Sequence, residues 1–271
     1  MKVNIILGSA CNLKCKNCIQ RGIKFDNSKV NIDAFCNKLV ASIYPIDGIS
    51  FGGGEPLLYL KYIKKIVEAA SCHSIITTNG TLIDDDYVSF ANSNDIFTVI
   101  SLYGQALPKC FTNLNRLNYS YVVTGALDES ILMKTDKLIF FNIQHNVDGI
   151  SYISEKDIDA FLQSVEKSNY LKAKFRQWFE YVLSRKKPLP NCFNETTVNI
   201  DLHFNKYLCF RKLDSKIGHL NDIIAFHHPY YSNTCQSCSI RNICKGGCIV
   251  SNTPNIECYW MKKCYDYFQR L

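Results

Sequence analysis

The segment SACNLKCKNC at residues 9–18 places Cys11, Cys15 and Cys18 within eight residues of one another. An apolar, β-branched run at residues 3–7 precedes the segment and predicts a buried strand, so the cysteines lie on the loop that follows this strand. Three thiolates leave one corner of a [4Fe-4S] cube without a protein ligand. The spacing therefore predicts a cluster that can bind and reduce a further molecule.

The alternative interpretation of this loop is a zinc site. With 14 cysteines in 271 residues, such a triplet can arise by chance, and only its context can decide. Zinc would need a fourth ligand nearby, but the next histidine is His73. We therefore prefer the iron-sulfur interpretation.

The distribution of the cysteines also indicates two domains. The chain is 47% apolar, which suffices for one large domain or for a medium domain and a small one. Six cysteines crowd between Cys235 and Cys264, which marks a separate metal-rich tail. We predict one domain at residues 1–185 and a second at residues 186–271, joined by a proline-broken linker.

Composition and charge limit the location and the partners. No signal peptide and no apolar run of membrane-spanning length is visible, so we expect a cytoplasmic protein with no membrane contact. In that reducing compartment, clustered cysteines are more often metal ligands than disulfides. The net charge of +7, without a long basic run apart from residues 185–187, predicts no nucleic-acid partner but permits an acidic one. Because Met1 directly precedes the first strand, we expect no leader-recognition domain before it.

After the first strand, strand-like and amphipathic stretches alternate. Strands are expected at residues 48–51, 74–77, 97–102, 119–123 and 137–143, and helices at residues 31–43, 58–70, 84–92, 154–170 and 171–185. This alternation predicts a parallel sheet with right-handed crossovers. Six such units are fewer than the eight of a full barrel, so we expect an α/β fold: a partial (β/α)6 barrel with a small cysteine-rich C-terminal domain. The aromatic stripe of residues 171–185 is expected to pack against the barrel or the tail.

A glycine turn, Phe51-Gly52-Gly53-Gly54-Glu55-Pro56, follows the second expected strand. Glycines let a backbone approach a ligand closely or take a positive φ, and Glu55 is presented at the carboxyl edge of the sheet, where the active sites of such folds lie. A carboxylate at this edge can receive an ammonium group. The alternative is a plain strand-to-helix turn, which the pairing with the cysteine loop disfavours.

These motifs resemble the radical S-adenosylmethionine superfamily, in order and at matching strand ends over residues 1–150. The matching segments are the cysteine loop, Gly53-Gly54-Glu55-Pro56, Thr77-Thr78-Asn79-Gly80-Thr81 and Ile100-Ser101-Leu102-Tyr103-Gly104. The resemblance implies that a [4Fe-4S] cluster binds the methionine moiety of S-adenosylmethionine. One electron then yields a 5′-deoxyadenosyl radical, which abstracts hydrogen from the substrate.

The same resemblance implies roles for single residues. Gly53, Gly54 and Glu55 would hold the methionine amino group, while Ser101 would lie near the ribose and Asn79 within the cofactor site. The position before the last loop cysteine is usually aromatic in this superfamily and touches adenine, but here it is Asn17.

A second constellation, Cys235-x2-Cys238-x5-Cys244-x3-Cys248, closely resembles the SPASM extension of radical enzymes that mature peptides. The resemblance implies two auxiliary iron-sulfur clusters. One would be held by Cys235, Cys238, Cys244 and Cys258, and the other by Cys192, Cys209 and Cys248. We prefer Cys258 to Cys264 as a ligand, and a tail with two structural zinc ions is the alternative. Phe204 departs from the glycine that the extension usually has five residues before the position of Cys209.

The expected function is modification of a ribosomally synthesised peptide by hydrogen abstraction. The product would be a crosslink, an oxidised side chain or an epimer, and Cys110, near the catalytic edge, is the candidate hydrogen donor for epimerisation. A precursor peptide and a reductant such as flavodoxin or ferredoxin are the expected partners.

Two alternatives remain. One is an anaerobic sulfatase maturase, although such enzymes place an aspartate directly after the position of Cys209. Here that residue is Phe210, and Asp201 or Asp214 could substitute for the aspartate. The other is a non-catalytic iron-sulfur or zinc binding protein.

Overall fold

The computed structural model describes residues 1–15, 18, 24–25, 29–42, 45–132, 134–143, 153–184, 197–209, 212–219, 237–244 and 254–271. The chain divides into two compact units. Unit 1 comprises Met1–Ser101, Gln105–Asn118 and Cys192–Ala225, and unit 2 comprises Leu102–Gly104, Tyr119–Asn191 and Phe226–Leu271. The division into sequence domains 1–185 and 186–271 stays a prediction.

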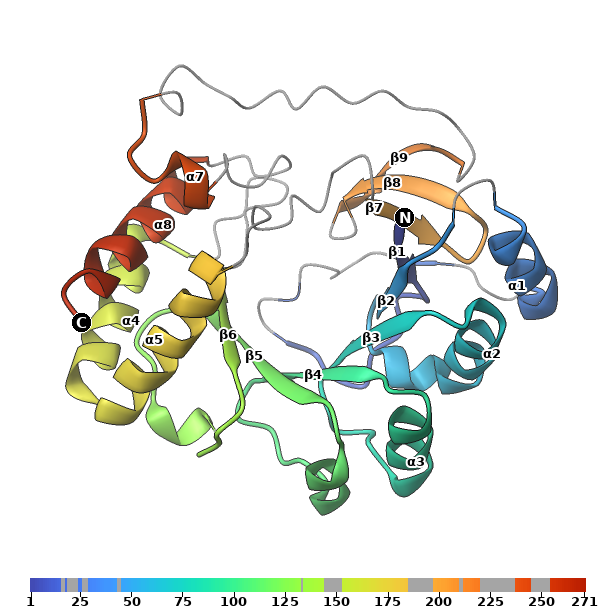
Figure 1. Ribbon diagram of the computed structural model, residues 1–271, viewed down its shortest axis with the longest axis horizontal. Helices are drawn as coiled ribbons and strands as arrows, with labels where there is room; N and C mark the ends of the chain where they lie inside the picture. Colours follow the sequence, from blue (N-terminus) through green and yellow to red (C-terminus); the bar gives the residue numbers. More distant parts are fainter. Residues whose placement is uncertain are drawn as a thin grey trace. The chain divides into compact units, whose positions relative to one another are not determined.

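A mainly parallel sheet forms the centre of unit 1 (Figure 1). Its strands are β1 (Lys2–Ile6), β2 (Gly48–Gly52), β3 (His73–Thr78), β4 (Phe97–Leu102), β7 (Thr197–Asp201), β8 (Asn205–Cys209) and β9 (Lys212–His219). Their order is β4-β3-β2-β1-β7-β8-β9, and the strands from β4 to β7 are parallel, whereas β8 and β9 are antiparallel to their neighbours. The carboxyl ends of β1, β2, β3 and β4 therefore share one edge of the sheet.

The two faces of this sheet differ in polarity, because successive side chains of a strand point to opposite faces. One face is apolar and buried; it carries Val3, Ile5, Ile49, Phe51, Ile76, Val198 and Ile200. The other face carries exposed or half-buried groups such as Asn4, Ser50 and His73. Asn4 Nδ2 donates to Asn199 Oδ1 at 2.8 Å across β1 and β7.

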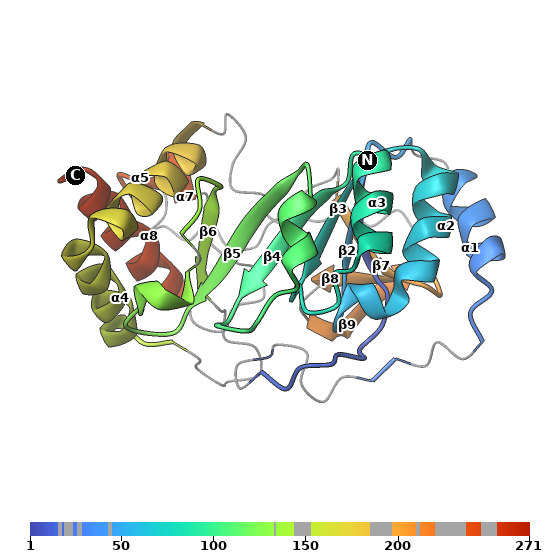
Figure 2. The ribbon, with the colours of Figure 1, turned by 90° about the horizontal axis from the view of Figure 1, so that it is seen from below.

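Three amphipathic helices lie side by side on the same side of the unit 1 sheet (Figures 1 and 2). They are α1 (Ile32–Val40), α2 (Leu60–Ala70) and α3 (Asp85–Ser93). Asn31 caps α1 by accepting from two backbone N–H groups, and Asp84 caps α3 by accepting from Tyr87 N. Each cap stabilises its helix by about 1 kcal/mol. The sequence predicted all three helices to within a few residues.

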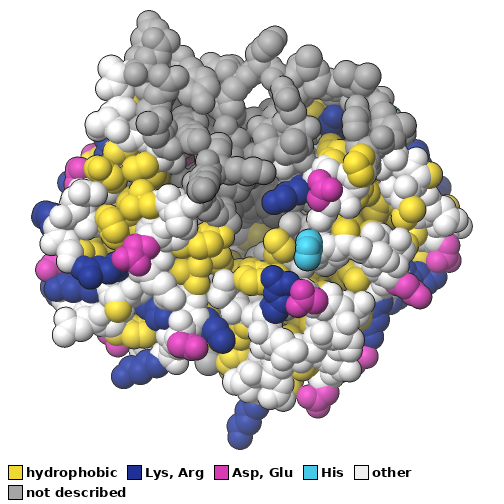
Figure 3. Space-filling model, viewed as in Figure 1, with side chains coloured by type: hydrophobic (Ala, Val, Ile, Leu, Met, Phe, Trp, Pro, Cys, Tyr) yellow, Lys and Arg dark blue, Asp and Glu magenta, His cyan; other side chains and the backbone are white. Residues whose placement is uncertain are grey.

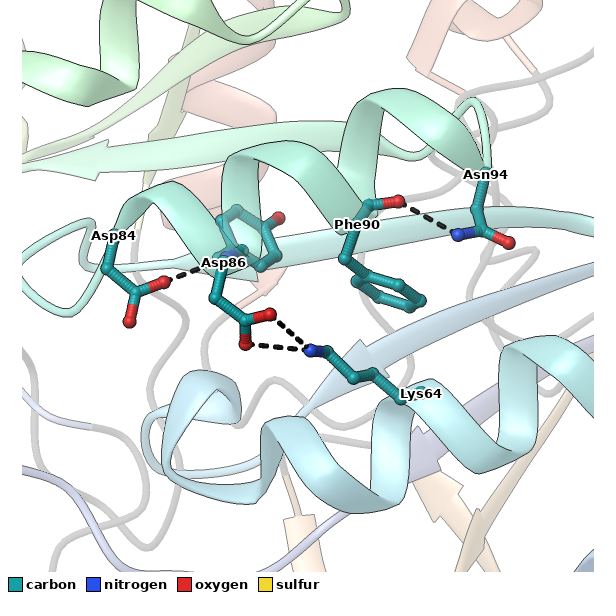
Figure 4. A network of polar contacts seen from close by, with 6 residues as sticks. Lys64, Asp84, Asp86, Phe90 and Asn94 are labelled. Atoms are coloured by element: carbon teal, nitrogen blue, oxygen red, sulfur yellow. Dashed lines mark hydrogen bonds and ion pairs between the residues drawn. The ribbon is translucent and has the colours of Figure 1, made fainter.

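A polar network joins α2 and α3 at the surface (Figure 4). Lys64 Nζ lies 2.7 Å from both carboxylate oxygens of Asp86 and 5.6 Å from the centre of the Phe90 ring. At the end of α3, Asn94 Nδ2 donates to Phe90 O at 2.9 Å. Because the ion pair is partly exposed to water, it contributes less than about 1 kcal/mol. The buried apolar faces of the helices therefore supply most of the stability.

Aromatic side chains form the core of unit 2. Its elements include β5 (Leu117–Val123), β6 (Ile139–Ile143), α4 (Glu155–Lys167), α5 (Asn169–Ser184), α7 (Arg241–Cys244) and α8 (Pro254–Phe268), and β5 and β6 are parallel. The ring of Trp178 on α5 lies 5.7 Å from Phe141 of β6 and 5.7 Å from Trp260 of α8, measured between ring centres. Phe175 meets Tyr267 of α8 at 5.2 Å. The aromatic stripe of residues 171–185 thus packs against the tail, as expected.

Short 3-10 helices lie in the described connections: η1 (Pro56–Tyr59), η2 (Lys109–Asn113) and η3 (Glu129–Ile131). The strands β7, β8 and β9 were not predicted from the sequence. β7 pairs in parallel with β1, so that Val3 opposes Val198 and Ile5 opposes Ile200, far apart along the chain. No local sequence pattern predicts a pairing between strands so far apart along the chain.

The α/β class is confirmed, and the partial barrel stays a prediction. No described helix is long and apolar enough to cross a membrane.

Candidate active site

The cysteine loop is fixed by its backbone to the glycine turn of residues 52–56. Gly54 N donates to Gly8 O at 2.9 Å. Glu55 N donates to Ala10 O at 2.8 Å. These bonds continue the pairing of β1 and β2 past the ends of both strands. The loop and the turn thus form one hydrogen-bonded unit at the carboxyl edge of the sheet.

Only glycine fits at two positions of the turn. A Cβ atom at Gly54 would lie 2.1 Å from Ala10 O, and one at Gly53 would lie 2.4 Å from Gly8 O. Gly53 also has a φ of +127°, a backbone conformation that residues with a Cβ atom rarely adopt. The sequence predicted either close approach of a ligand or a positive φ; Gly53 has the positive φ, and the described close approach is that of the chain's own cysteine loop.

The three loop cysteines lie within electrostatic reach of one another. Cys11 is exposed, Cys15 and Cys18 are half-buried, and Cys18 N donates to Cys15 O at 3.3 Å. Burial raises the pKa of the Cys11 and Cys15 thiols, and a Cys18 thiolate nearby adds to the rise of both. Three thiols without a competing histidine are a donor set that fits an iron-sulfur cluster. In the described part of the chain no three His, Cys, Asp or Glu side chains converge as a metal site, so ligation stays a prediction.

Glu55 is buried and holds the glycine turn against β3. Its Oε1 accepts from Thr78 Oγ1 at 2.6 Å and from Leu57 N at 3.0 Å, and its Oε2 accepts from Asn79 N at 2.8 Å. Burial raises the pKa of the Glu55 carboxyl, and these three hydrogen bonds partly offset the rise. A carboxylate offers about four acceptor positions, so the described contacts leave one on Oε2. The predicted contact with an ammonium group is restricted to that position.

Asn79 connects the end of β3 to the cysteine loop. Its Nδ2 donates to Asn12 Oδ1 at 2.9 Å and lies 4.0 Å from Cys11 Sγ. Its Oδ1 accepts from Thr81 Oγ1 at 2.6 Å, and Asn12 Nδ2 donates to the same hydroxyl at 2.7 Å. The side chain of Asn79 therefore orients the loop residue beside the first cysteine. Asn12 was not predicted, although its place between two loop cysteines was a usable signal.

Gln105 joins the end of β4 to Asn79, which follows β3. Ser101, the predicted ribose contact, is half-buried, and its carbonyl accepts from Gln105 Nε2 at 2.7 Å. The same nitrogen donates to Asn79 O at 2.7 Å. Sequence reasoning missed Gln105, because nothing in its local sequence indicates these two partners.

Cys110 lies in η2, where its thiol donates to Ile83 O at 3.4 Å. The bond ties η2 to the segment before α3. Its role as a hydrogen donor stays a prediction.

The predicted ligands of the tail fall in both units. Cys192, Cys235 and Cys248 lie outside the described residues. Cys209 ends β8 of unit 1, whereas Cys238, Cys244 and Cys258 are half-buried residues of unit 2. Cys264 is fully buried on α8, and its burial raises the pKa of the thiol well above the usual value. The half-buried Cys258 on the same helix is the more accessible thiol, which supports the preference for it as a ligand.

Asp201 is the centre of the β7–β8 hairpin. Its Oδ1 accepts from His203 N at 2.8 Å and from Asn205 N at 3.0 Å. Its Oδ2 accepts from Asn205 Nδ2 and from Tyr207 Oη, both at 2.8 Å. Four donors fill the acceptor positions of one carboxylate. Asp201 is therefore a structural residue, which disfavours it as a substitute catalytic base.

Phe204 occupies the position at which the SPASM resemblance expects glycine. Its φ is +62°, so this chain keeps the left-handed backbone that glycine adopts readily. Its ring stacks on Phe35 of α1 at 4.5 Å, and Lys38 Nζ lies 4.7 Å from the ring centre. Packing against α1 offsets the backbone strain.

Residues 5–121 match the Radical SAM superfamily. This stretch contains the cysteine loop, the glycine turn and the ends of β3 and β4. The chain carries a radical SAM domain. S-adenosylmethionine and a [4Fe-4S] cluster are characteristic cofactors of this superfamily. The prediction of the superfamily is thereby confirmed.

Known proteins and solved structures are similar to this chain over most of its length. A cysteine-type anaerobic sulfatase-maturating enzyme of Clostridium perfringens (strain 13 / Type A) is 25% identical over 89% of the chain and 86% of its own length. The structure of native anSMEcpe with bound AdoMet and Cp18Cys peptide has a TM-score of 0.66 at 18% identity, covering 99% of this chain and 97% of that one. Streptococcus suis SuiB bound to precursor peptide SuiA has a TM-score of 0.60 at 19% identity, covering 92% and 72%. At these identities the two structures establish the fold.

Proposed function

We propose that the chain is a radical SAM enzyme that modifies a ribosomally synthesised peptide by forming a crosslink, oxidising a side chain or epimerising a residue. The proposal rests on the backbone hydrogen bonds that join the cysteine loop to the glycine turn, inside a domain that matches the superfamily. The bound cluster and S-adenosylmethionine would supply the 5′-deoxyadenosyl radical that abstracts hydrogen from the substrate.

The chain's own residues would hold these groups. Cys11, Cys15 and Cys18 would ligate the cluster, and the remaining acceptor position of Glu55 would face the methionine ammonium group. Burial of Glu55 keeps water from competing for that position. Auxiliary clusters would be held by the tail cysteines: Cys235, Cys238, Cys244 and Cys258 for one, and Cys192, Cys209 and Cys248 for the other.

A peptide partner is supported by the two similar structures, because each has a peptide bound. The described surface shown in Figure 3 mixes Lys and Arg side chains with Asp and Glu, without a large area of one sign. The described part of this face therefore fits a peptide better than a nucleic acid, whose phosphates need a continuous basic stripe. We propose a precursor peptide, a reductant such as flavodoxin or ferredoxin, and a cytoplasmic location.

The test is reductive cleavage of S-adenosylmethionine. The reconstituted chain with dithionite should produce 5′-deoxyadenosine, and Cys15→Ala should abolish it. The matched control is Cys36→Ala, which removes a buried thiol of α1 that is not a predicted ligand and should leave production unchanged. Bound iron without 5′-deoxyadenosine from the unmodified chain would instead favour the non-catalytic binding protein.

A second candidate, a sulfatase maturase, is favoured by the similarity to the Clostridium perfringens enzyme. Against it stand Phe210 directly after Cys209 and the engagement of Asp201 by four donors. Incubation with cysteine- and serine-containing sulfatase-derived peptides, followed by mass spectrometry, decides between the two. Formylglycine in the product would establish the maturase, and its absence beside active S-adenosylmethionine cleavage would favour another peptide substrate.

A further inference from the structure

One amide group of Gln105 links the ends of two neighbouring strands. Its Nε2 donates to Asn79 O after β3 and to Ser101 O near the end of β4, each at 2.7 Å. A side-chain amide has two N–H groups, so each has a carbonyl partner. The register of β3 with β4 ends at Thr78 and Ile100, so Gln105 joins the two segments one residue beyond that pairing.

We propose that Gln105 is a positioning residue that sets the spacing between the β3 loop and β4, and so shapes the side of the site that would hold S-adenosylmethionine. The proposal rests on the proposed function, because Asn79 and Ser101 are the predicted cofactor contacts on these strands. Asn79 N also donates to Glu55 Oε2 at 2.8 Å. A shift of Asn79 would therefore move the carboxylate predicted to receive the methionine ammonium group.

An independent apolar contact packs the loop after β3 against residues of and after β4. Gly80 has a φ of +78°, and a Cβ atom there would lie 2.8 Å from Leu107 Cδ2 and 2.9 Å from Ile100 Cγ2. The backbone after Asn79 thus rests directly on residues of and after β4. Gln105 supplies the polar contacts between the loop after β3 and β4. Without its two donors, the apolar packing at Gly80 would have to hold these segments together.

The cysteine loop has a separate attachment, which makes the proposal testable. Gly54 N and Glu55 N bind the loop backbone without involving Gln105. A change at Gln105 should therefore weaken S-adenosylmethionine binding while the iron content stays at the level of the unmodified chain. A merely structural role would lower stability without a selective effect on this cofactor.

The test compares Gln105→Met, which keeps the side-chain length and removes both donors, with Gln177→Met. Gln177 also directs its Nε2 to a backbone carbonyl, that of Asp136, but on α5 of unit 2. Hydrogen exchange is first measured on the cofactor-free chain. We expect Gln105→Met to accelerate exchange at residues 79–83, and Gln177→Met to leave these amides unchanged.

Equilibrium dialysis of the cluster-loaded protein then measures S-adenosylmethionine binding. Loss of two hydrogen bonds that position the site should weaken binding about tenfold in Gln105→Met at equal iron content. Unchanged exchange at residues 79–83, or unchanged binding together with a lower melting temperature, would overturn the role of Gln105. If the unmodified chain binds no S-adenosylmethionine while the exchange result holds, the proposed function fails instead, and the cofactor role of Gln105 fails with it.

Discussion

Substitution of Gly54 by alanine should detach the cysteine loop. The added Cβ atom would lie 2.1 Å from Ala10 O and 2.6 Å from Ala10 C, whereas nonbonded carbon atoms rest about 3.5–4 Å from their neighbours. The obstacle is backbone, so the loop must retreat by about 1.5 Å. A retreat of that size stretches the 2.8 Å bond from Glu55 N to Ala10 O beyond hydrogen-bonding distance.

The expected cost follows from the bonds that are lost. Separation of the loop from the turn removes the bonds donated by Gly54 N and Glu55 N, each worth about 0.5–1.5 kcal/mol net. The free energy of unfolding should therefore fall by about 1–3 kcal/mol in urea titrations. Because Cys11 directly follows Ala10, we also expect Gly54→Ala to lose about four iron atoms per chain after reconstitution, the content of one [4Fe-4S] cluster.

Gly48→Ala, on the strand β2 that leads into the turn, is the matched control. Its Cβ atom would lie 3.3 Å from His73 O, which requires an adjustment of only a few tenths of an ångström. This variant should stay within about 1 kcal/mol of the unmodified chain and keep its iron. If Gly54→Ala matched Gly48→Ala in both stability and iron content, the close approach of loop and turn would not be what fixes the cysteines.

Further outcomes are expected for four variants. Tyr207→Phe removes the buried hydroxyl that donates to Asp201, so the free energy of unfolding should fall by about 1–2 kcal/mol in urea, and an unchanged value would contradict the structural role of that carboxylate. Cys264→Ala should cost about 1 kcal/mol, because the thiol is fully buried, without changing the iron content. Cys258→Ala, in contrast, should lower the iron content, and equal iron in the two cysteine variants would refute the assignment of Cys258. Asp86→Asn, which breaks an exposed ion pair, should cost less than about 1 kcal/mol by thermal unfolding, and a larger loss would show that the pair is more than a surface contact.

Periodicity and spacing predicted most of the described helices and strands up to residue 184 well. The strands expected at residues 48–51, 74–77 and 97–102 lie at Gly48–Gly52, His73–Thr78 and Phe97–Leu102. These elements have strong local signals, because their alternating apolar side chains face a buried helix layer. The strands β7, β8 and β9 were missed, because β7 gains its place through pairing with β1, which no local pattern encodes.

The candidate active site shows the same division between features with a local sequence signal and contacts between remote segments. The sequence alone determined which residues gather at the carboxyl edge, since the cysteine loop, the glycine turn and Asn79 follow predicted parallel strands and Ser101 lies at the end of another. Only the tertiary structure decided what those residues touch. It assigned the glycines to the chain's own loop and gave three acceptor positions of Glu55 to the protein. The physical reason is that side-chain periodicity marks the strands and the loops that follow them along the chain, whereas hydrogen-bond partners depend on distances between loops that are remote in sequence.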